Sequence, residues 1–212
     1  PHAGQVNALV TLNLRPATRK AWEFENRKAR SMTDAVDNNS NMPDALEVAG
    51  AQERRFRQTG RLVGPLHGVV MAIKDQYDTF DMRTTSGADA QYANDRPPDD
   101  ATFVKRLRDA GAIILAKSNL AEYATDGARS AFGGTFCNPY DTERAPGMSS
   151  AGSGSSVTAA AAQNPLWHRQ GRLGKSTALQ LVWSITQHHG ARDRMAESLT
   201  RAELYQLVWA EP

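Results

Sequence analysis

A chain of 212 residues, of which 40% are hydrophobic and 23% charged, can bury a substantial core and has the composition of a globular protein. The net charge is only +2 and both signs are mixed along the chain, which argues against a nucleic-acid-binding surface. The single cysteine, Cys137, excludes an internal disulfide, and no apolar run approaches the ~20 residues of a membrane span. We therefore expect a cytoplasmic protein that binds neither nucleic acid nor membrane.

The first sixty residues predict a strand, a helix, a loop and a second helix. Residues 6–14 alternate in part between apolar and polar types, as a strand does, and the charged residues 15–30 favour a helix. The Asn-rich residues 31–43 are typical of a loop, and the Pro-Asp pair that follows favours a helix over 44–57. The expected buried side of this helix consists of Leu46, Ala49 and Phe56.

The middle of the chain alternates between strand and helix patterns. Residues 69–73 form a continuous apolar run that ends at Lys74, which is typical of a buried strand. Asp100 is a suitable N-cap for a helix over 101–110, and residues 112–116 form the next apolar run. The order strand, loop, helix, strand predicts an α/β fold.

A short helix is expected over 119–125, and residues 127–156 are then rich in Gly, Ser and Pro. Composition leaves two interpretations open, a flexible linker or a structured functional loop. Residues 157–162 favour the start of a helix whose first N–H groups could face an anion or a developing oxyanion.

Lys74 is the first candidate for chemistry. At the end of a buried strand, desolvation would lower its pKa toward the range in which an amine acts as a base. Periodicity alone favours the commoner alternative, a lysine that reaches solvent from the strand end.

Five blocks of sequence, taken in order, resemble the amidase signature family, and weaker similarity extends back over 6–13. The blocks are GPLHGVVMAIKD (64–75), TTSGA (84–88), DATFVKRLRDAGAIILAKSNLAEYA (100–124), FGGTFCNPYD (132–141) and APGMSSAGSGSSVTAA (145–160). The resemblance implies a mixed α/β sheet flanked by helices, over a domain of residues 1–162. Because the family's chains are about twice this length, we expect the sheet to be incomplete.

The resemblance also implies a catalytic Ser–cisSer–Lys triad that hydrolyses the amide carbon–nitrogen bond of a small molecule without a metal or organic cofactor. In this chain the lysine is Lys74 and the cis-serine is Ser149, which relays a proton from the nucleophilic serine to the lysine. Ser150 is expected to support them by hydrogen bonding, and Gly133 and Gly134 to shape the substrate pocket. The family's second glycine before the cis-serine is Met148 here.

The nucleophile is where the chain departs from the family pattern. The corresponding region, 171–177, reads GRLGKST and contains no Gly-Gly-Ser motif, so Ser176, about three residues away, is the nearest candidate. Two interpretations follow: an amidase that uses Ser176, or a truncated, catalytically impaired amidase-like protein that lacks the nucleophilic serine.

Residues 163–212 do not continue the family resemblance, and we expect a divergent, partly helical tail with an amphipathic helix over 197–209. A nucleotide-binding module built on GKST at 174–177 is a further alternative, although the first glycine of a phosphate loop is missing. His188 and His189 are adjacent and lack the spacing of helical zinc ligands. The exposed edges of an incomplete sheet would favour association, for which a homodimer is the partner considered.

Overall fold

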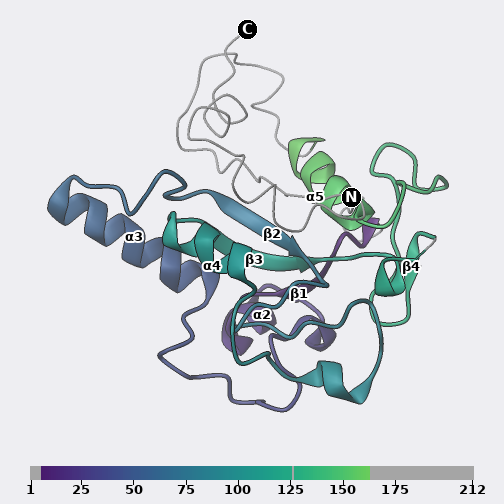
Figure 1. The fold of residues 1–212 in the computed structure, drawn as a ribbon, viewed down its shortest axis with the longest axis horizontal. Helices are drawn as coiled ribbons and strands as arrows, with labels where there is room; N and C mark the ends of the chain where they lie inside the picture. The colour runs from purple at the N-terminus through teal and green to yellow at the C-terminus, as the bar shows by residue number, and fades with distance from the viewer. Residues whose placement is uncertain (1–5, 126, 163–212) are drawn as a thin grey trace, which may run out of the picture.

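A mixed three-stranded sheet forms the centre of the computed structural model, which describes residues 6–125 and 127–162 (Figure 1). Its strand order is β1-β3-β2, in which β1 pairs antiparallel with β3 and β2 pairs parallel with β3. The bounds are Leu9–Leu12 for β1, Val70–Lys74 for β2 and Ile113–Ser118 for β3. The mixed α/β fold predicted from the sequence is confirmed.

Three helices of eight residues or more accompany the sheet within the described part of the chain: α3 (Ala45–Thr59), α4 (Thr102–Asp109) and α5 (Ala151–Ala162). α4 packs Val104 into a core cluster with Met71, Ile73 and Ile114 of the sheet. α5 contacts both β2 and β3 and lies above the sheet in Figure 1.

The two faces of the sheet carry different side chains at the carboxyl ends of β2 and β3. In the register, Lys74 lies beside Ser118, while Lys117 lies between Ile73 and Thr11. Because successive side chains point to opposite faces, Lys74 and Ser118 share the face toward α5, and Lys117 and Thr11 share the other. This alternation decides which polar groups can meet.

α3 begins and ends with strong local signals. Asp44 and Glu47 form a capping box, in which the Asp44 carboxylate accepts from the Glu47 N–H at 2.9 Å and the Glu47 carboxylate accepts from the Asp44 N–H at 2.6 Å. Gly60 ends the helix in the left-handed conformation, with φ at 65°. The helix predicted over 44–57 is therefore confirmed.

The predicted buried side of α3 is wrong, because Leu46 and Phe56 are each 45% exposed. The buried positions are Ala45 and Gln52. Gln52 uses both ends of its amide, donating to Gly111 O at 2.9 Å and accepting from the Gly68 N–H at 2.9 Å. A polar side chain that satisfies two loop groups thus takes the place expected for an apolar one.

Three other predicted helices differ from the structure. Residues 15–30 form only α2 (Pro16–Ala21) and the 3-10 turn η1 (Asn26–Lys28), separated by Glu23 with φ at 59°. The helix expected over 119–125 is reduced to the 3-10 turn η3 (Glu122–Ala124). The helix expected from residue 157 begins six residues earlier, as α5.

Asp100 does not cap α4, whose N-cap is Ala101. Its carboxylate instead accepts from the Phe80 N–H at 3.0 Å and pairs with Arg108 Nε at 3.0 Å. The residue type suits a cap, but an arginine two turns into the helix competes for the same carboxylate.

The remaining described elements are short. They are the 3-10 turn η2 (Gln91–Asn94) and the paired strands β4 (Arg129–Ser130) and β5 (Gly134–Thr135). The Gly/Ser-rich stretch 127–156 is therefore a structured loop that contains this hairpin and leads into α5, and the linker alternative is wrong.

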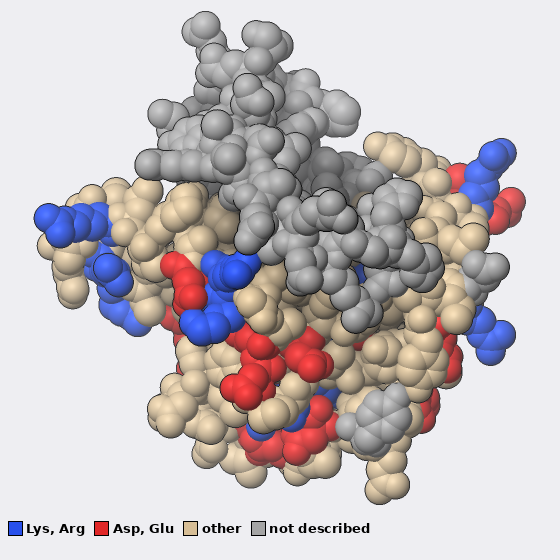
Figure 2. Space-filling model, in the orientation of Figure 1, with Lys and Arg blue, Asp and Glu red and all other residues tan. Residues whose placement is uncertain are grey.

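Charges of both signs lie on the face drawn in Figure 2, with basic side chains at the end of α3 that is farthest from the sheet. Across residues 6–125 and 127–162, no helix combines the length and apolar character that crossing a membrane requires. The candidate nucleophile Ser176, the two histidines and the amphipathic helix over 197–209 lie outside the described residues.

Candidate functional site

Lys74 and Ser149 are brought together, although they are 75 residues apart in the sequence. Lys74 is the last residue of β2 and its Nζ donates to Ser149 Oγ at 2.8 Å. Ser149 lies two residues before α5, and the peptide bond between Met148 and Ser149 is cis. The strand end and the start of the helix thus present an amine and a hydroxyl to each other.

Burial changes the chemistry of this amine. Lys74 is only 1% exposed, and desolvation lowers the pKa of its ammonium group from 10.5 to about 8. About a tenth of the Lys74 amine is then neutral at pH 7, whereas a solvated lysine would be almost fully protonated. A neutral amine can accept a proton from the Ser149 hydroxyl, which is the first requirement for a base at this position.

The segment around Ser149 is fixed to the end of β3 by three contacts. The Ala121 N–H donates to Ser149 O at 3.1 Å, and the hydroxyls of Ser118 and Ser153 hydrogen bond at 2.7 Å. At Gly152 a Cβ atom would lie 2.2 Å from the backbone oxygen of Asn119, so the first turn of α5 packs directly against the chain that leaves β3. Glycine is required there because no larger residue fits.

A buried ion pair between Asp75 and Lys117 lies on the opposite face of the sheet. Asp75 is the residue that follows Lys74 in the sequence. Lys117 Nζ is 3.3 Å from the Asp75 carboxylate, and both side chains are fully buried. The Thr85 hydroxyl donates to the same carboxylate, and Lys117 also donates to Thr84 Oγ1 at 2.7 Å. Burial raises the pKa of Asp75 and lowers that of Lys117, while their contact opposes both effects.

The other expected site residues, Ser150, Gly133 and Gly134, make no hydrogen bond to the side chains of Lys74 and Ser149 among the contacts of the described residues. Ser150 is buried, and its carbonyl accepts from the Ser153 N–H at 3.0 Å in the first turn of α5. Gly133 is packed against Val10 and Asn119, with a Cβ position only 2.5 Å from Val10 Cγ1.

Gly134 begins β5 with φ at 75°, so it contributes backbone conformation. The Met148 side chain is 59% exposed, and it therefore extends into solvent beside Ser149.

Sequence reasoning missed the pairing of Ser118 with Ser153 and the buried Asp75–Lys117 pair. A signal for the second was present, because Asp75 and Lys117 each stand at the carboxyl end of an apolar run, and parallel strands end at the same edge. Nothing in the sequence distinguished Ser118 or Ser153 from the other serines. Among the described residues no group of three or more His, Cys, Asp or Glu side chains is arranged to hold a metal ion.

Known proteins resemble this chain both in sequence and in structure. The family model described as Amidase matches residues 26–164. The A subunit of the glutamyl-tRNA(Gln) amidotransferase of Heliobacterium modesticaldum is 44% identical over 117 residues, and its counterpart in Thermobifida fusca is 48% identical over 117 residues. Each match covers 54% of this chain and 23% of the relative, so the chain spans less than a quarter of these relatives.

A solved structure agrees with the sequence comparisons. The native peptide amidase from Stenotrophomonas maltophilia is similar with a TM-score of 0.55 and 35% identity, over 73% of this chain and 26% of that chain. Since the family model covers more than half of the residues, the chain belongs to the amidase family.

Proposed function

We propose that this chain supplies the base and the proton-relaying serine of an amidase-type hydrolase that acts on the amide carbon–nitrogen bond of a small molecule. The observation that carries the proposal is the 2.8 Å contact between Lys74 Nζ and Ser149 Oγ at a buried strand end. Membership in the amidase family and similarity to a peptide amidase support this reaction class.

The proposed chemistry follows from the protonation state of Lys74. While the ammonium is charged, its N–H donates to Ser149 Oγ. Once neutral, the amine accepts the Ser149 proton, and Ser149 can then accept a proton from a serine that attacks the amide carbonyl. The relay then passes this proton to the leaving nitrogen, so that a free amine departs and an acyl-enzyme remains. Water gives its proton to the same relay as it attacks the acyl group, and the relay returns the proton to the serine oxygen as the acid leaves. No step in this scheme requires a metal or an organic cofactor.

The attacking serine is the open element of the proposal, and Ser176 is the candidate in this chain. We place the amidase-like unit at 1–162 and the divergent tail at 163–212, a division supported by the end of the family match at residue 164. The catalytically impaired alternative differs only in whether that tail provides a nucleophile.

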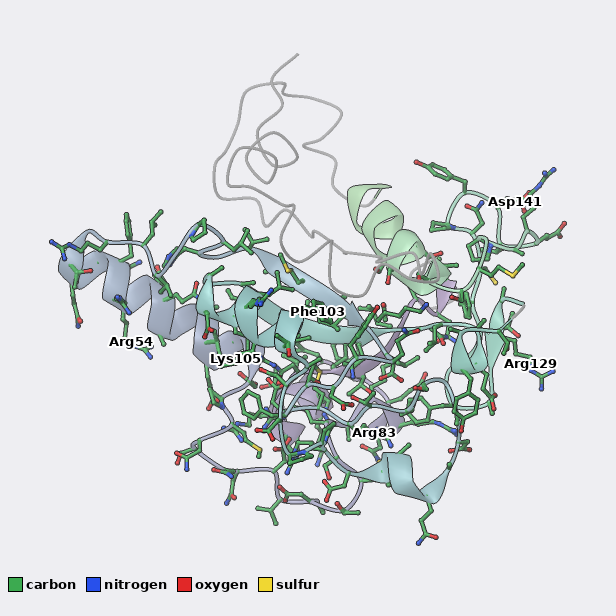
Figure 3. The ribbon with its side chains drawn as sticks, viewed as in Figure 1. Arg54, Arg83, Phe103, Lys105, Arg129 and Asp141 are labelled. Atoms are coloured by element: carbon green, nitrogen blue, oxygen red, sulfur yellow. The ribbon has the colours of Figure 1, made fainter. Side chains whose placement is uncertain are left out.

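Ammonia release from simple aromatic and aliphatic primary amides by the full chain tests the proposal. Lys74→Met and Ser149→Ala should each reduce turnover by at least about 100-fold, the usual contribution of general-base catalysis. Lys105→Met is the matched control, because Lys105 is a lysine on α4 that is 67% exposed and pairs with Asp109 on the same helix (Figure 3). Ser176→Ala tests the nucleophile.

Turnover that survives Lys74→Met would show that the amine is not the base. A chain that releases no ammonia, yet gains thermal stability when an amide is added, would contradict hydrolysis and favour the impaired alternative.

A further inference from the structure

A buried pair of hydroxyl groups lies on the same face of the sheet as Lys74. Ser118 is the last residue of β3, and Ser153 lies in the first turn of α5, which packs on this face (Figure 1). Both serines are fully buried, and their Oγ atoms are 2.7 Å apart. This hydrogen bond joins the end of β3 to the start of α5.

The pair closes a ring of contacts that includes Lys74 and Ser149. Lys74 is the register partner of Ser118, and the Ser118 carbonyl accepts from the N–H of Asp75 at 3.0 Å. The strand ladder therefore fixes Lys74 relative to Ser118. Ser153 follows Ser149 by four residues. Lys74 Nζ donates to Ser149 Oγ at 2.8 Å, and this contact completes the ring.

Stability alone does not explain this hydroxyl pair. Among the described residues, neither hydroxyl has a hydrogen-bond partner other than its counterpart. Exchanging two such buried partners for apolar side chains of similar shape is nearly neutral, because both groups lose their desolvation cost together. The bond does, however, fix the distance between the first turn of α5 and the end of β3. It thereby fixes where the Ser149 hydroxyl lies relative to the Lys74 amine.

The pKa of Lys74 reports how closely α5 is held against the strand ends. α5 has no charged residue, and the charged side chains nearest in the strands, Asp75 and Lys117, pair with each other on the opposite face. Lys74 is 1% exposed, and burial is the influence that lowers its pKa to about 8. Water that entered between α5 and the sheet would therefore raise this pKa toward 10.5.

We propose that Ser118 and Ser153 are positioning residues that hold the Ser149 hydroxyl against the Lys74 amine. The contact that assembles the proton relay would then lie in the first turn of α5, outside the relay itself. The inference deepens the proposed function and rests on it, because a held Ser149 hydroxyl serves catalysis only if Lys74 is the base. Neither positioning serine is assigned a step in the chemistry.

Titration of the Lys74 side chain by NMR tests this role in the full chain with isotope-labelled lysine, and Lys74→Met identifies the signal by its loss. In the double variant Ser118→Ala/Ser153→Ala the pKa of Lys74 should rise. The neutral fraction of its amine at pH 7 should fall by at least about threefold. The Tm of the double variant should stay close to that of the unsubstituted chain, because both hydroxyls are removed together.

The single variants separate positioning from stability. Ser118→Ala and Ser153→Ala each leave one buried hydroxyl without a partner, so each should lower the Tm and raise the pKa of Lys74 as the double variant does. Ser155→Ala is the matched control, because Ser155 is a buried serine of the same helix whose hydroxyl donates to Cys137 O at 3.0 Å. It should lower the Tm and leave the pKa of Lys74 unchanged.

The inference is overturned if the pKa of Lys74 is unchanged or lower in the double variant, or if Ser155→Ala raises it equally. If Ser118→Ala does not fold, Ser153→Ala and the double variant decide. The titration needs no turnover, so a chain that releases no ammonia counts against the proposed function and leaves this test intact. In a chain that does release ammonia, an unchanged pKa refutes the positioning role alone.

Discussion

Replacing Lys74 with methionine should stabilise the folded chain at neutral pH. Methionine keeps the length of the side chain in a site that is 1% exposed, and it removes an ammonium group whose pKa is lowered from 10.5 to about 8. At about 1.4 kcal/mol for each factor of ten in acidity, holding that proton in the fold costs about 3 kcal/mol. The lost contact with Ser149 offsets about 1 kcal/mol, which leaves a net gain of about 2 kcal/mol.

The pH dependence of this gain follows from proton binding. Between pH 8 and 10.5 the unfolded chain holds a proton on Lys74 that the folded chain has lost, so the stability of the unsubstituted chain rises with pH. Below pH 8 both states are protonated and the cost is constant. The advantage of the methionine variant should therefore be largest below pH 8 and should disappear as pH approaches 10.5.

Thermal unfolding of both chains from about pH 6.5 to 10 measures this difference. A gain of about 2 kcal/mol in a chain of this size corresponds to a Tm about 4–8 °C higher at pH 7. Lys105→Met provides the exposed-lysine control and should show no such trend. A Tm difference that is independent of pH, or a variant less stable at pH 7, would refute the assignment of a desolvated amine at Lys74.

Two further substitutions test the surroundings of the site. Gly152→Ala should lower the free energy of unfolding, measured in urea, by about 1–3 kcal/mol, because its Cβ would lie 2.2 Å from the Asn119 backbone. Gly154→Ala is the control and should be neutral or stabilising, because no atom lies within 4 Å of its Cβ position. Equal effects of the two substitutions would contradict the close packing of α5. Asp75→Asn should cost about 3–5 kcal/mol because it leaves Lys117 charged and unpaired, and combining it with Lys117→Met should recover much of that loss. An unchanged urea midpoint for Asp75→Asn would show that the pair is not ionised in the fold.

Much of the fold could be predicted because its signals are local. The apolar runs at 69–73 and 112–116 correspond to β2 and β3, and the Pro-Asp start at residue 44 corresponds to α3. The buried face of α3 could not be read in the same way. Its apolar positions Leu46 and Phe56 are half exposed, whereas the polar Gln52 is buried and its amide satisfies two loop backbone groups.

Sequence motifs predicted Lys74 and Ser149 as site residues. The contacts that position these two residues could be identified only from the structure. The hydrogen bond between Ser118 and Ser153 joins residues 35 apart whose type is common in the chain. Whether Ser118 faces α5 depends on the register of β3 against β2, which no local pattern specifies.

That register also explains why a buried lysine can keep a lowered pKa beside an aspartate. Asp75 follows Lys74 immediately, and a carboxylate on the same face would favour the charged ammonium and raise its pKa. The alternation of the strand sends Asp75 to the opposite face, where Lys117 and Thr85 bind its carboxylate. Desolvation is then the dominant influence on the pKa of Lys74. The pairing of Asp75 on the opposite face of the sheet is therefore a condition for a partly neutral Lys74 amine that can accept a proton.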